Sequence, residues 1–136
     1  MTYTLSFSFL HEYDLNHTGI TIPIVLSLGN IEQAALAKLD TGASFCIFQR
    51  ELGEALGLNV ESGAREMVGT ATEPFLVYGH DLTVSALGFD MEATVYFAAR
   101  QGFPRNVLGR RGWLDKLRLG IIDYEGKLYF SAYDTP

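Results

Sequence analysis

Apolar and polar residues alternate along much of this chain, and one region shows the pattern most clearly. From position 20 to 28 every second residue is a large aliphatic one: Ile20, Ile22, Ile24, Leu26 and Leu28. This period of two is typical of a strand that buries one face. Gly29-Asn30 follows as a signal for a two-residue turn, and the chain continues through 31–39. The pattern predicts a β-hairpin that ends immediately before Asp40.

The same alternation recurs in three other regions. It predicts a half-buried strand over 3–9, and two strands over 82–86 and 93–97 joined by a turn at Gly88-Phe89-Asp90. A last strand pair, 118–124 and 127–133, is predicted around Glu125-Gly126. The chain is therefore expected to be mainly β.

Two short segments have helical spacing instead. Apolar residues recur between Phe48 and Leu56, and Gly57 then fits a C-terminal helix cap. The second segment, 110–117, places Trp113, Leu114 and Leu117 on one side. Both apolar sets are interpreted as core rather than as ligand contacts.

The length of 136 residues suits one domain. We expect residues 1–19 to form an N-terminal strand and loop extension, and 20–136 to form the main body. Apolar residues make up 48% and charged residues 19% of the chain, which argues against disorder.

The net charge of −6 gives no general attraction to polyanions, so we expect no nucleic-acid partner. Basic residues do crowd into one window, which we interpret as a solvated helix face rather than an anion site. They are Arg105, Arg110, Arg111, Lys116 and Arg118.

The single cysteine, Cys46, excludes an internal disulfide, and its apolar neighbours predict a small buried side chain rather than a reactive thiol. No apolar stretch approaches the roughly 20 residues that span a bilayer. The N-terminus has no signal-peptide pattern. These features predict a soluble protein without membrane contact and favour a cytoplasmic location.

The candidate chemistry begins with Asp40-Thr41-Gly42, which follows the predicted hairpin directly. Gly42 would let the backbone approach a ligand closely, because it has no Cβ. The Thr41 hydroxyl can form hydrogen bonds, and the end of a rigid strand would aim the Asp40 carboxylate. A second signal, Asn106-Val107-Leu108-Gly109-Arg110, lies at the start of the second predicted helix.

With these two motifs in this order, the chain resembles the retropepsin-like aspartic proteases, the family of retroviral proteases and their cellular and bacterial relatives. The similarity covers roughly 20–133, including "LDTGAS" and "NVLGRRGWLDKLRLGII". The resemblance implies a single-domain closed β-barrel with one or two short helices. It also implies an aspartic endopeptidase, a hydrolase that acts as a symmetric homodimer on a peptide or protein and needs neither cofactor nor metal.

In that family, two Asp-Thr-Gly turns meet at a twofold axis and hold one water between two carboxylates. Like charges so close together cannot both ionise easily, so the pair shares a proton. One member takes a proton from the water while the other donates to the peptide carbonyl oxygen. By resemblance, Asp40 of each subunit would play this part.

The resemblance also assigns supporting roles. Thr41 would hydrogen-bond across the axis, and a flap within Met67–Val77, with its tip near Gly69 to Pro74, would close over the substrate. Residues expected to contact substrate are Gly42, Ala43, Ser44, Val68, Gly69, Thr70 and Val107. Ser44 departs from the viral pattern, where an Asp often pairs with the arginine that corresponds to Arg110.

The sequence also offers alternatives to an aspartic protease. A metal site at His11, Glu12, Asp14 and His17 has no helical His-Glu-x-x-His spacing and is interpreted as a polar loop, and His80 stands alone at a predicted strand start. No motif supports serine or cysteine catalysis. The main rival is a catalytically silent retropepsin-like domain that serves as a dimerisation or peptide-binding module. An unrelated small β-barrel is the third possibility.

Overall fold

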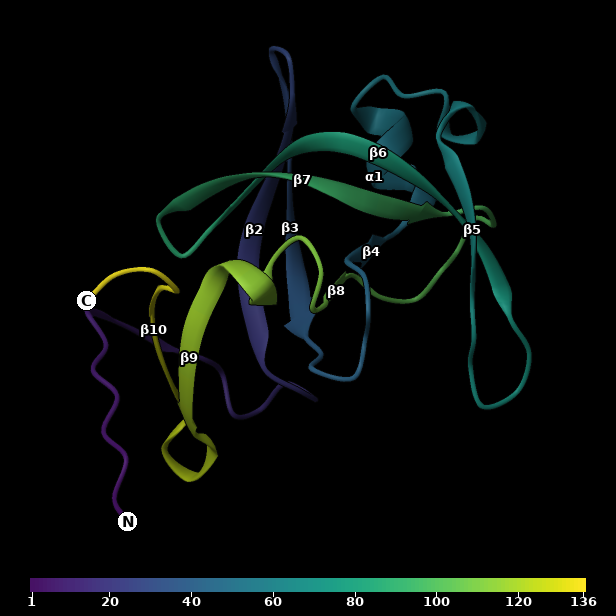
Figure 1. The fold of residues 1–136 in the computed structure, drawn as a ribbon. Coiled ribbons are helices and arrows are strands. Elements are labelled where there is room, and N and C mark those ends of the chain that lie inside the picture. The colour runs from purple at the N-terminus through teal and green to yellow at the C-terminus, as the bar shows by residue number, and fades with distance from the viewer.

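Strands form 49% and helices 11% of the computed structural model, which describes residues 1–136, so the predicted mainly β class is confirmed (Figure 1). One sheet has the strand order β2-β3-β8-β4-β7-β6-β5, with a further pairing between β2 and β6, and the other has the order β1-β10-β9. The strands are β1 (Phe9–Glu12), β2 (Thr21–Leu28), β3 (Ile31–Leu39), β4 (Ile47–Phe48), β5 (Ala64–Val68), β6 (Phe75–Ala86), β7 (Phe89–Ala98), β8 (Val107–Leu108), β9 (Leu117–Ile122) and β10 (Lys127–Ala132). The helices are α1 (Arg50–Ala55) and the 3-10 turns η1 (Val60–Ser62), η2 (Leu114–Lys116) and η3 (Asp123–Glu125).

The first predicted hairpin is confirmed. β2 and β3 pair antiparallel from Thr21↔Lys38 to Leu28↔Ile31, which leaves Gly29-Asn30 as the turn. Gly29 has φ +59°, a left-handed conformation that glycine adopts without steric cost. Ile22 and Leu26 are fully buried, so the alternating face does pack into the core.

The β6–β7 hairpin forms where the alternation predicts it, but its turn lies one residue earlier. Phe89 already pairs with Ala86, so the turn is Leu87-Gly88 rather than Gly88-Phe89-Asp90. Both turn residues have positive φ, 56° for Leu87 and 81° for Gly88. Such a turn matches the twist of the two strands, and this fit holds Leu87 in a conformation that it would otherwise disfavour.

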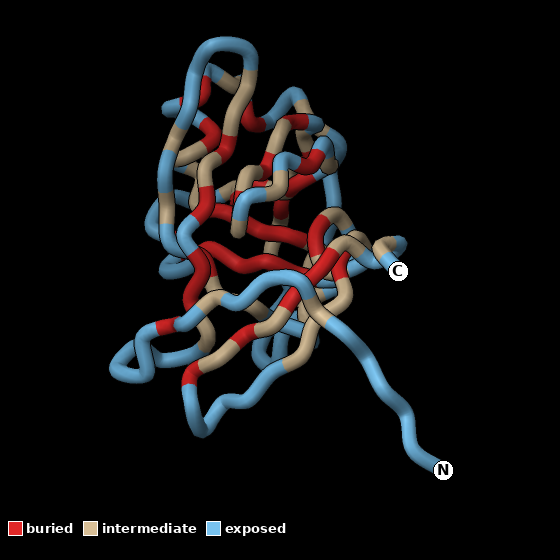
Figure 2. The backbone as a smooth tube through the Cα atoms, turned by 90° about the vertical axis from the view of Figure 1, so that its left-hand side faces the viewer, coloured by how far each residue is buried: buried red, intermediate tan, exposed pale blue.

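The predicted strand over 3–9 is wrong for most of its length. β1 begins only at Phe9, while Tyr3 and Leu5 are 84% and 64% exposed. The N–H of Ser8 donates to the Ser131 hydroxyl (2.8 Å) instead of a backbone carbonyl, so the ladder with β10 ends there. Ser6 and Phe7 still contact the body of the molecule, through the Ser6 carbonyl and the Phe7 ring beside Tyr129, whereas the chain before them extends away from it (Figure 2). The domain division at residue 19 stays a prediction.

The predicted helix over 110–117 is also wrong. Only η2 forms there, because Gly112 has φ +98° and Leu117 already pairs with Ala132 as the first residue of β9. The apolar set is nevertheless core, as predicted for Trp113 (0% exposed) and Leu117 (8%), whereas Leu114 is half-buried.

The basic window therefore cannot be one helix face. Arg118 lies in β9, where its guanidinium donates to the carbonyls of Ser6 (2.7 Å) and Thr135 (2.8 Å) and so ties the two termini together. Lys116 donates to the Glu92 carbonyl. These two side chains have structural roles, which the sequence pattern did not indicate.

The first predicted helix is confirmed as α1. Its C-terminus has the expected glycine cap: Leu58 N–H donates to Gly53 O (3.1 Å), Gly57 N–H to Glu54 O (2.9 Å), and Gly57 has φ +86°. α1 is the longest helix at six residues, and no helix is long or apolar enough to cross a membrane.

The core lies between the sheets, where buried segments run through the middle of the molecule (Figure 2). Its largest fully buried side chains include Trp113, Phe48 and Phe97. Cys46 is fully buried beside them, as predicted, and its burial raises the pKa of the thiol to about 11.

Tyr13 offers a test of the packing between β1 and the β9–β10 turn. Burial, together with a 2.6 Å hydrogen bond to Asp123 and its charge, raises the pKa of Tyr13 from 10.0 to about 12. Because the folded pKa lies above the unfolded one, this stabilisation is complete below pH 10 and is lost as the pH rises toward 12. We expect Tyr13→Phe to lower the free energy of unfolding by about 1 kcal/mol at neutral pH.

Urea unfolding at pH 7 to 12 checks this expectation, with Tyr124→Phe as the control because Tyr124 is 95% exposed. The wild type should lose stability more steeply than Tyr13→Phe above pH 10. Equal slopes for the two proteins would contradict the assigned role of the hydroxyl.

Candidate functional site

The turn that carries Asp40 follows β3, and β8 lies between β3 and β4 beside it. β3 ends at Leu39, and β8 pairs with it in parallel through Lys38↔Val107 and Leu39↔Leu108. The same Val107 pairs antiparallel with Ile47 of β4 on its other side. Asp40 N–H donates to Leu108 O (3.0 Å), so the backbone of the turn is fixed from its first residue.

Within the turn, the Asp40 side chain folds back on its own backbone. Its Oδ1 accepts the Gly42 N–H (2.9 Å), and its carbonyl accepts the Ala43 N–H (3.2 Å). The carboxylate makes no other hydrogen bond or ion pair, and Asp40, Thr41 and Gly42 are all exposed. The second oxygen, Oδ2, is therefore free to act on a ligand.

At Gly109 the second motif, 106–110, packs closely against the segment that follows Asp40-Thr41-Gly42. Arg110 N–H and Arg111 N–H donate to the carbonyls of Ala43 and Ser44, both at 2.9 Å. This approach is so close that a Cβ at position 109 would lie 2.8 Å from Ala43 O and overlap the Phe45 carbonyl. Only glycine fits there, which makes the pairing of the two motifs a packing requirement.

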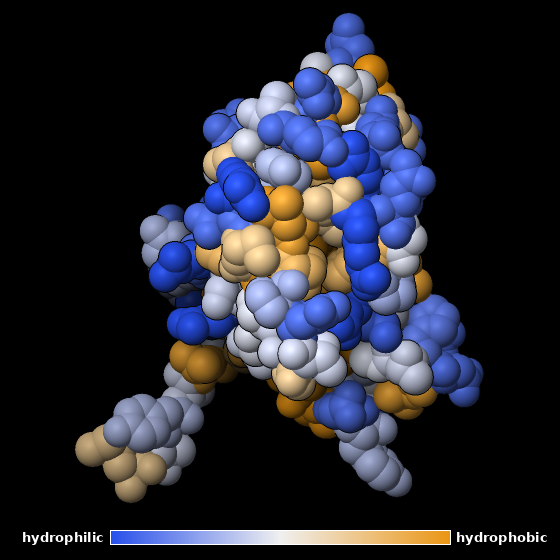
Figure 3. All heavy atoms as spheres, turned by 90° about the vertical axis from the view of Figure 1, so that its right-hand side faces the viewer, coloured by the Kyte–Doolittle hydropathy of each residue, from blue (hydrophilic) through white to orange (hydrophobic).

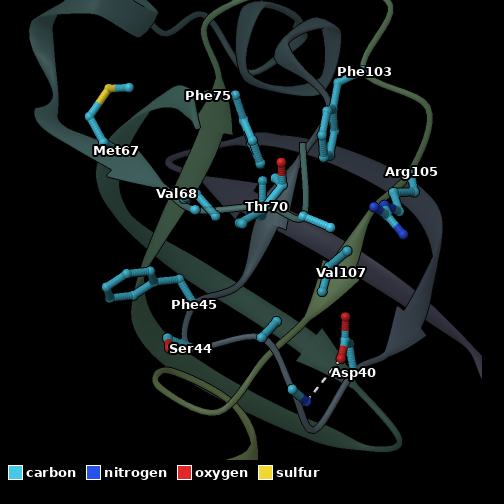
Figure 4. A pocket seen from close by; sticks show the side chains of 15 residues that line it. Asp40, Ser44, Phe45, Met67, Val68, Thr70, Phe75, Phe103, Arg105 and Val107 are labelled. Carbon is cyan, nitrogen blue, oxygen red and sulfur yellow. Dashed lines mark hydrogen bonds between the residues drawn. The ribbon is translucent and has the colours of Figure 1, made fainter. Parts of the chain in front are cut away.

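A cavity of about 470 Å³ opens beside Asp40. In Figure 4, Asp40 lies on its floor, Val68 and Thr70 come from the opposite side, and Phe75 and Phe103 form its far end. On the face that carries β5, apolar residues gather in the middle, inside a rim of hydrophilic ones (Figure 3). The lining residues are Asp40, Gly42, Ala43, Ser44, Phe45, Ile47, Met67, Val68, Gly69, Thr70, Ala71, Phe75, Phe103, Arg105 and Val107.

The predicted hairpin at 67–77 forms and covers this cavity. β5 and β6 pair antiparallel up to Val68↔Phe75, which leaves 69–74 as the connecting loop. The Thr70 hydroxyl accepts the Glu73 N–H (3.1 Å) and donates to the Glu73 carbonyl, and these bonds shape the tip. Glu73 and Pro74 do not line the cavity, whereas Gly69, Thr70 and Ala71 do.

The structure brings nearly all the predicted site residues together. Asp40, the predicted floor residues, the predicted flap residues and Val107 all line the cavity, and of the set only Thr41 does not. Arg110 makes no ion pair and instead lines a neighbouring hollow of about 440 Å³ with Ser44 and Asp115.

Sequence reasoning missed the aromatic end of the cavity and Arg105. Phe103, Arg105 and Val107 share one wall in Figure 4, but residues 103–106 lie outside any strand, and no pattern in the sequence indicated that they would line the cavity. Phe75 follows the loop of the predicted hairpin, and its ring stacks on Phe103 with centroids 5.2 Å apart.

The histidines and acids of the first segment form separate contacts. His11 Nε2 lies 3.1 Å from Thr21 O, and His17 Nδ1 lies 3.1 Å from Thr21 Oγ1. Nowhere in the chain do three His, Cys, Asp or Glu side chains converge to hold a metal. His80 lies inside β6 rather than at a strand start, with Nε2 2.8 Å from Val60 O.

No protein-family model matches this chain, and a search of curated proteins returns no match. Asp40 is the only acid that lines the cavity. One carboxylate starts either ionised, as a base, or protonated, as an acid, so a mechanism that uses an aspartate base and an aspartic acid together needs a second carboxyl group.

Proposed function

We propose that this chain is an aspartic endopeptidase that hydrolyses peptide bonds as a symmetric homodimer. The observation that carries the proposal is the Asp40 carboxylate. It lies exposed on a turn of fixed backbone, with one oxygen free, on the floor of a cavity of mixed polar and apolar lining that a hairpin covers.

The strand pairing supports the retropepsin-like barrel that we propose. β2 pairs with β6 as well as with β3, which joins the two ends of the order β2-β3-β8-β4-β7-β6. A sheet joined in this way has the connectivity of a closed barrel. The ten strands exceed those of a simple retropepsin fold, and β1, β10 and β9 form a sheet of their own.

The second acid in this proposal is Asp40 of a second copy. Asp40, Thr41 and Gly42 are exposed together, so a twofold contact at this turn would bring the two carboxylates face to face. The pair shares one proton. The ionised member takes a proton from a water, the water oxygen bonds to the peptide carbon, and the protonated member donates to the carbonyl oxygen.

Collapse of that tetrahedral species breaks the carbon–nitrogen bond. One hydroxyl of the tetrahedral species returns its proton to the ionised carboxylate while the leaving nitrogen takes a proton from the protonated one, so one water and one peptide bond give one acid and one amine. Both carboxylates return to their starting state. The hairpin over the cavity would exclude bulk water during this sequence, and the backbone groups of Gly42 to Ser44 would hold an extended peptide.

A mixed peptide pool tests the proposal. The purified chain should cut peptides at mildly acid pH, and a statine-type transition-state mimic should block every cut, because the mimic occupies both carboxylates. Peptides that bind but stay intact would support the rival reading, a peptide-binding or dimerisation module. Cuts that survive the mimic would point to a different mechanism.

If the active site is shared between two subunits, activity should depend on protein concentration. Activity per mole of chain should fall on dilution, and the concentration of half-activity should agree with the dimer dissociation constant from sedimentation. Activity that is constant per mole in a range where sedimentation finds only monomer would contradict the shared site.

A further inference from the structure

Arg105 is the only cationic side chain that lines the cavity with Asp40. It is exposed and makes no hydrogen bond or ion pair within the chain. In Figure 4 its guanidinium lies on the Val107 side of the cavity, on the same wall as Phe103. A charged group with no structural partner at a cavity of mixed polar and apolar lining is a candidate ligand-binding group.

Three other arginines have structural roles, and the remaining three, Arg65, Arg100 and Arg110, do not line this cavity. Arg50 pairs with Glu61 and donates to Ala99 O (2.8 Å), and Arg118 donates to two carbonyls at the termini. Arg111 lies over the Phe45 ring, 6.0 Å from its centroid. Arg105 has no comparable packing or pairing role.

The backbone on both sides of Arg105 is held in place. Gln49 donates through its side chain to Phe103 O (3.0 Å) and through its N–H to the Asn106 side chain (2.9 Å). Lys38 N–H donates to Asn106 O (2.8 Å). The guanidinium is therefore presented from a fixed segment, which reduces the entropy cost of using it to bind.

We propose that Arg105 makes this site selective for a substrate with an acidic side chain next to the scissile bond. This inference rests on the proposed protease function. A guanidinium binds a carboxylate through two parallel hydrogen bonds, and such charge-assisted pairs strengthen where water is displaced. Phe103 and Val107, each 5% exposed, flank Arg105 and offer an apolar surface to the methylenes of a glutamate.

The surroundings sharpen this selectivity. The whole chain carries a net charge of −6, so its overall field opposes an acidic peptide and the attraction must come locally from Arg105. A lysine or arginine at the same substrate position would meet the like charge of Arg105 beside an apolar wall and be rejected.

A cleavage experiment with paired peptides tests the inference. Peptides cut by the wild type are remade with Glu, Gln or Lys at each position that flanks the scissile bond. At one position the wild type should show a Glu over Gln preference in kcat/KM of about tenfold or more. Arg105→Leu should bring this ratio close to one, and Arg105→Glu should favour Lys. Arg100→Leu is the matched control, because Arg100 is exposed on the same connecting segment and does not line the cavity.

A binding experiment separates this inference from the proposed function. Asp40→Asn protein is titrated with the same Glu and Gln peptides, so that binding is measured whether or not the wild type cuts. A Glu preference that disappears with Arg105→Leu supports the role of Arg105, even if no peptide is ever cleaved. No Glu preference in either experiment, or one that survives Arg105→Leu, overturns it.

Discussion

Asp40→Asn should reduce peptide cleavage by about 10²- to 10⁴-fold, the range that a positioned acid or base contributes. The amide cannot accept a proton from water, and in a symmetric dimer both members of the pair change at once. The fold should remain intact, because the only side-chain bond of Asp40 is the one that its Oδ1 accepts from Gly42 N–H, and an amide oxygen can accept it equally well. Initial rates and thermal unfolding of the two proteins check both halves of this expectation.

Asp134→Asn provides a matched control. Asp134 is also exposed and also precedes a threonine, yet it lies in the C-terminal segment and does not line the cavity. It should leave cleavage unchanged. Full activity in Asp40→Asn would remove the basis for the proposed mechanism, whereas equal losses in both variants would indicate a general effect of charge.

Gly109→Ala should be strongly destabilising, by about 3 kcal/mol or more, since an overpacked side chain costs 1–3 kcal/mol and here the obstacle is backbone. The added Cβ would lie 2.6 Å from the Phe45 carbonyl carbon and 2.8 Å from the Ala43 carbonyl oxygen. To make room, β8 must move away from the 43–45 segment, which breaks the bonds from Arg110 and Arg111 to it. Urea unfolding measures the loss.

Gly69→Ala is the control for this substitution. No atom lies within 4 Å of the position that a Cβ at Gly69 would occupy, and its φ is not positive. Its stability should stay within about 0.5 kcal/mol of the wild type or rise slightly, because alanine restricts the unfolded chain. If Gly109→Ala were as stable as Gly69→Ala, the close approach at Gly109 would not be what holds the Asp40 turn.

The paired elements of the fold were predictable where the sequence pattern and the local turn agree. The β2–β3 hairpin and α1 each carry their own end signal, Gly29 in one and Gly57 in the other. In both elements the pattern and the turn residue lie within a few positions of each other, so local sequence was enough to predict them. The hairpin at 67–77 was instead expected from the family resemblance, and its loop at 69–74 agrees with that expectation.

The predicted strand over 3–9 and the predicted helix over 110–117 were wrong for the same physical reason. Residues 3–8 alternate like a strand, but pairing with β10 stops at Phe9. Residues 110–117 have helical spacing, but the pairing of Leu117 with Ala132 begins β9 early. The spacing of apolar residues shows which face of a segment can be buried. Whether the segment becomes a strand depends instead on which backbone groups lie opposite it in the folded chain.

For the site, the sequence by itself identified the acidic turn and the second motif that contains Gly109, and the family resemblance supplied the hairpin over 67–77. Only the tertiary structure decided that Asp40 is exposed with one free oxygen, and that Phe103 and Arg105 share its cavity. The physical reason is distance along the chain. A turn or a hairpin is specified by neighbouring residues, but a cavity is made by segments near 40, 70 and 105 that meet only when β8 inserts between β3 and β4.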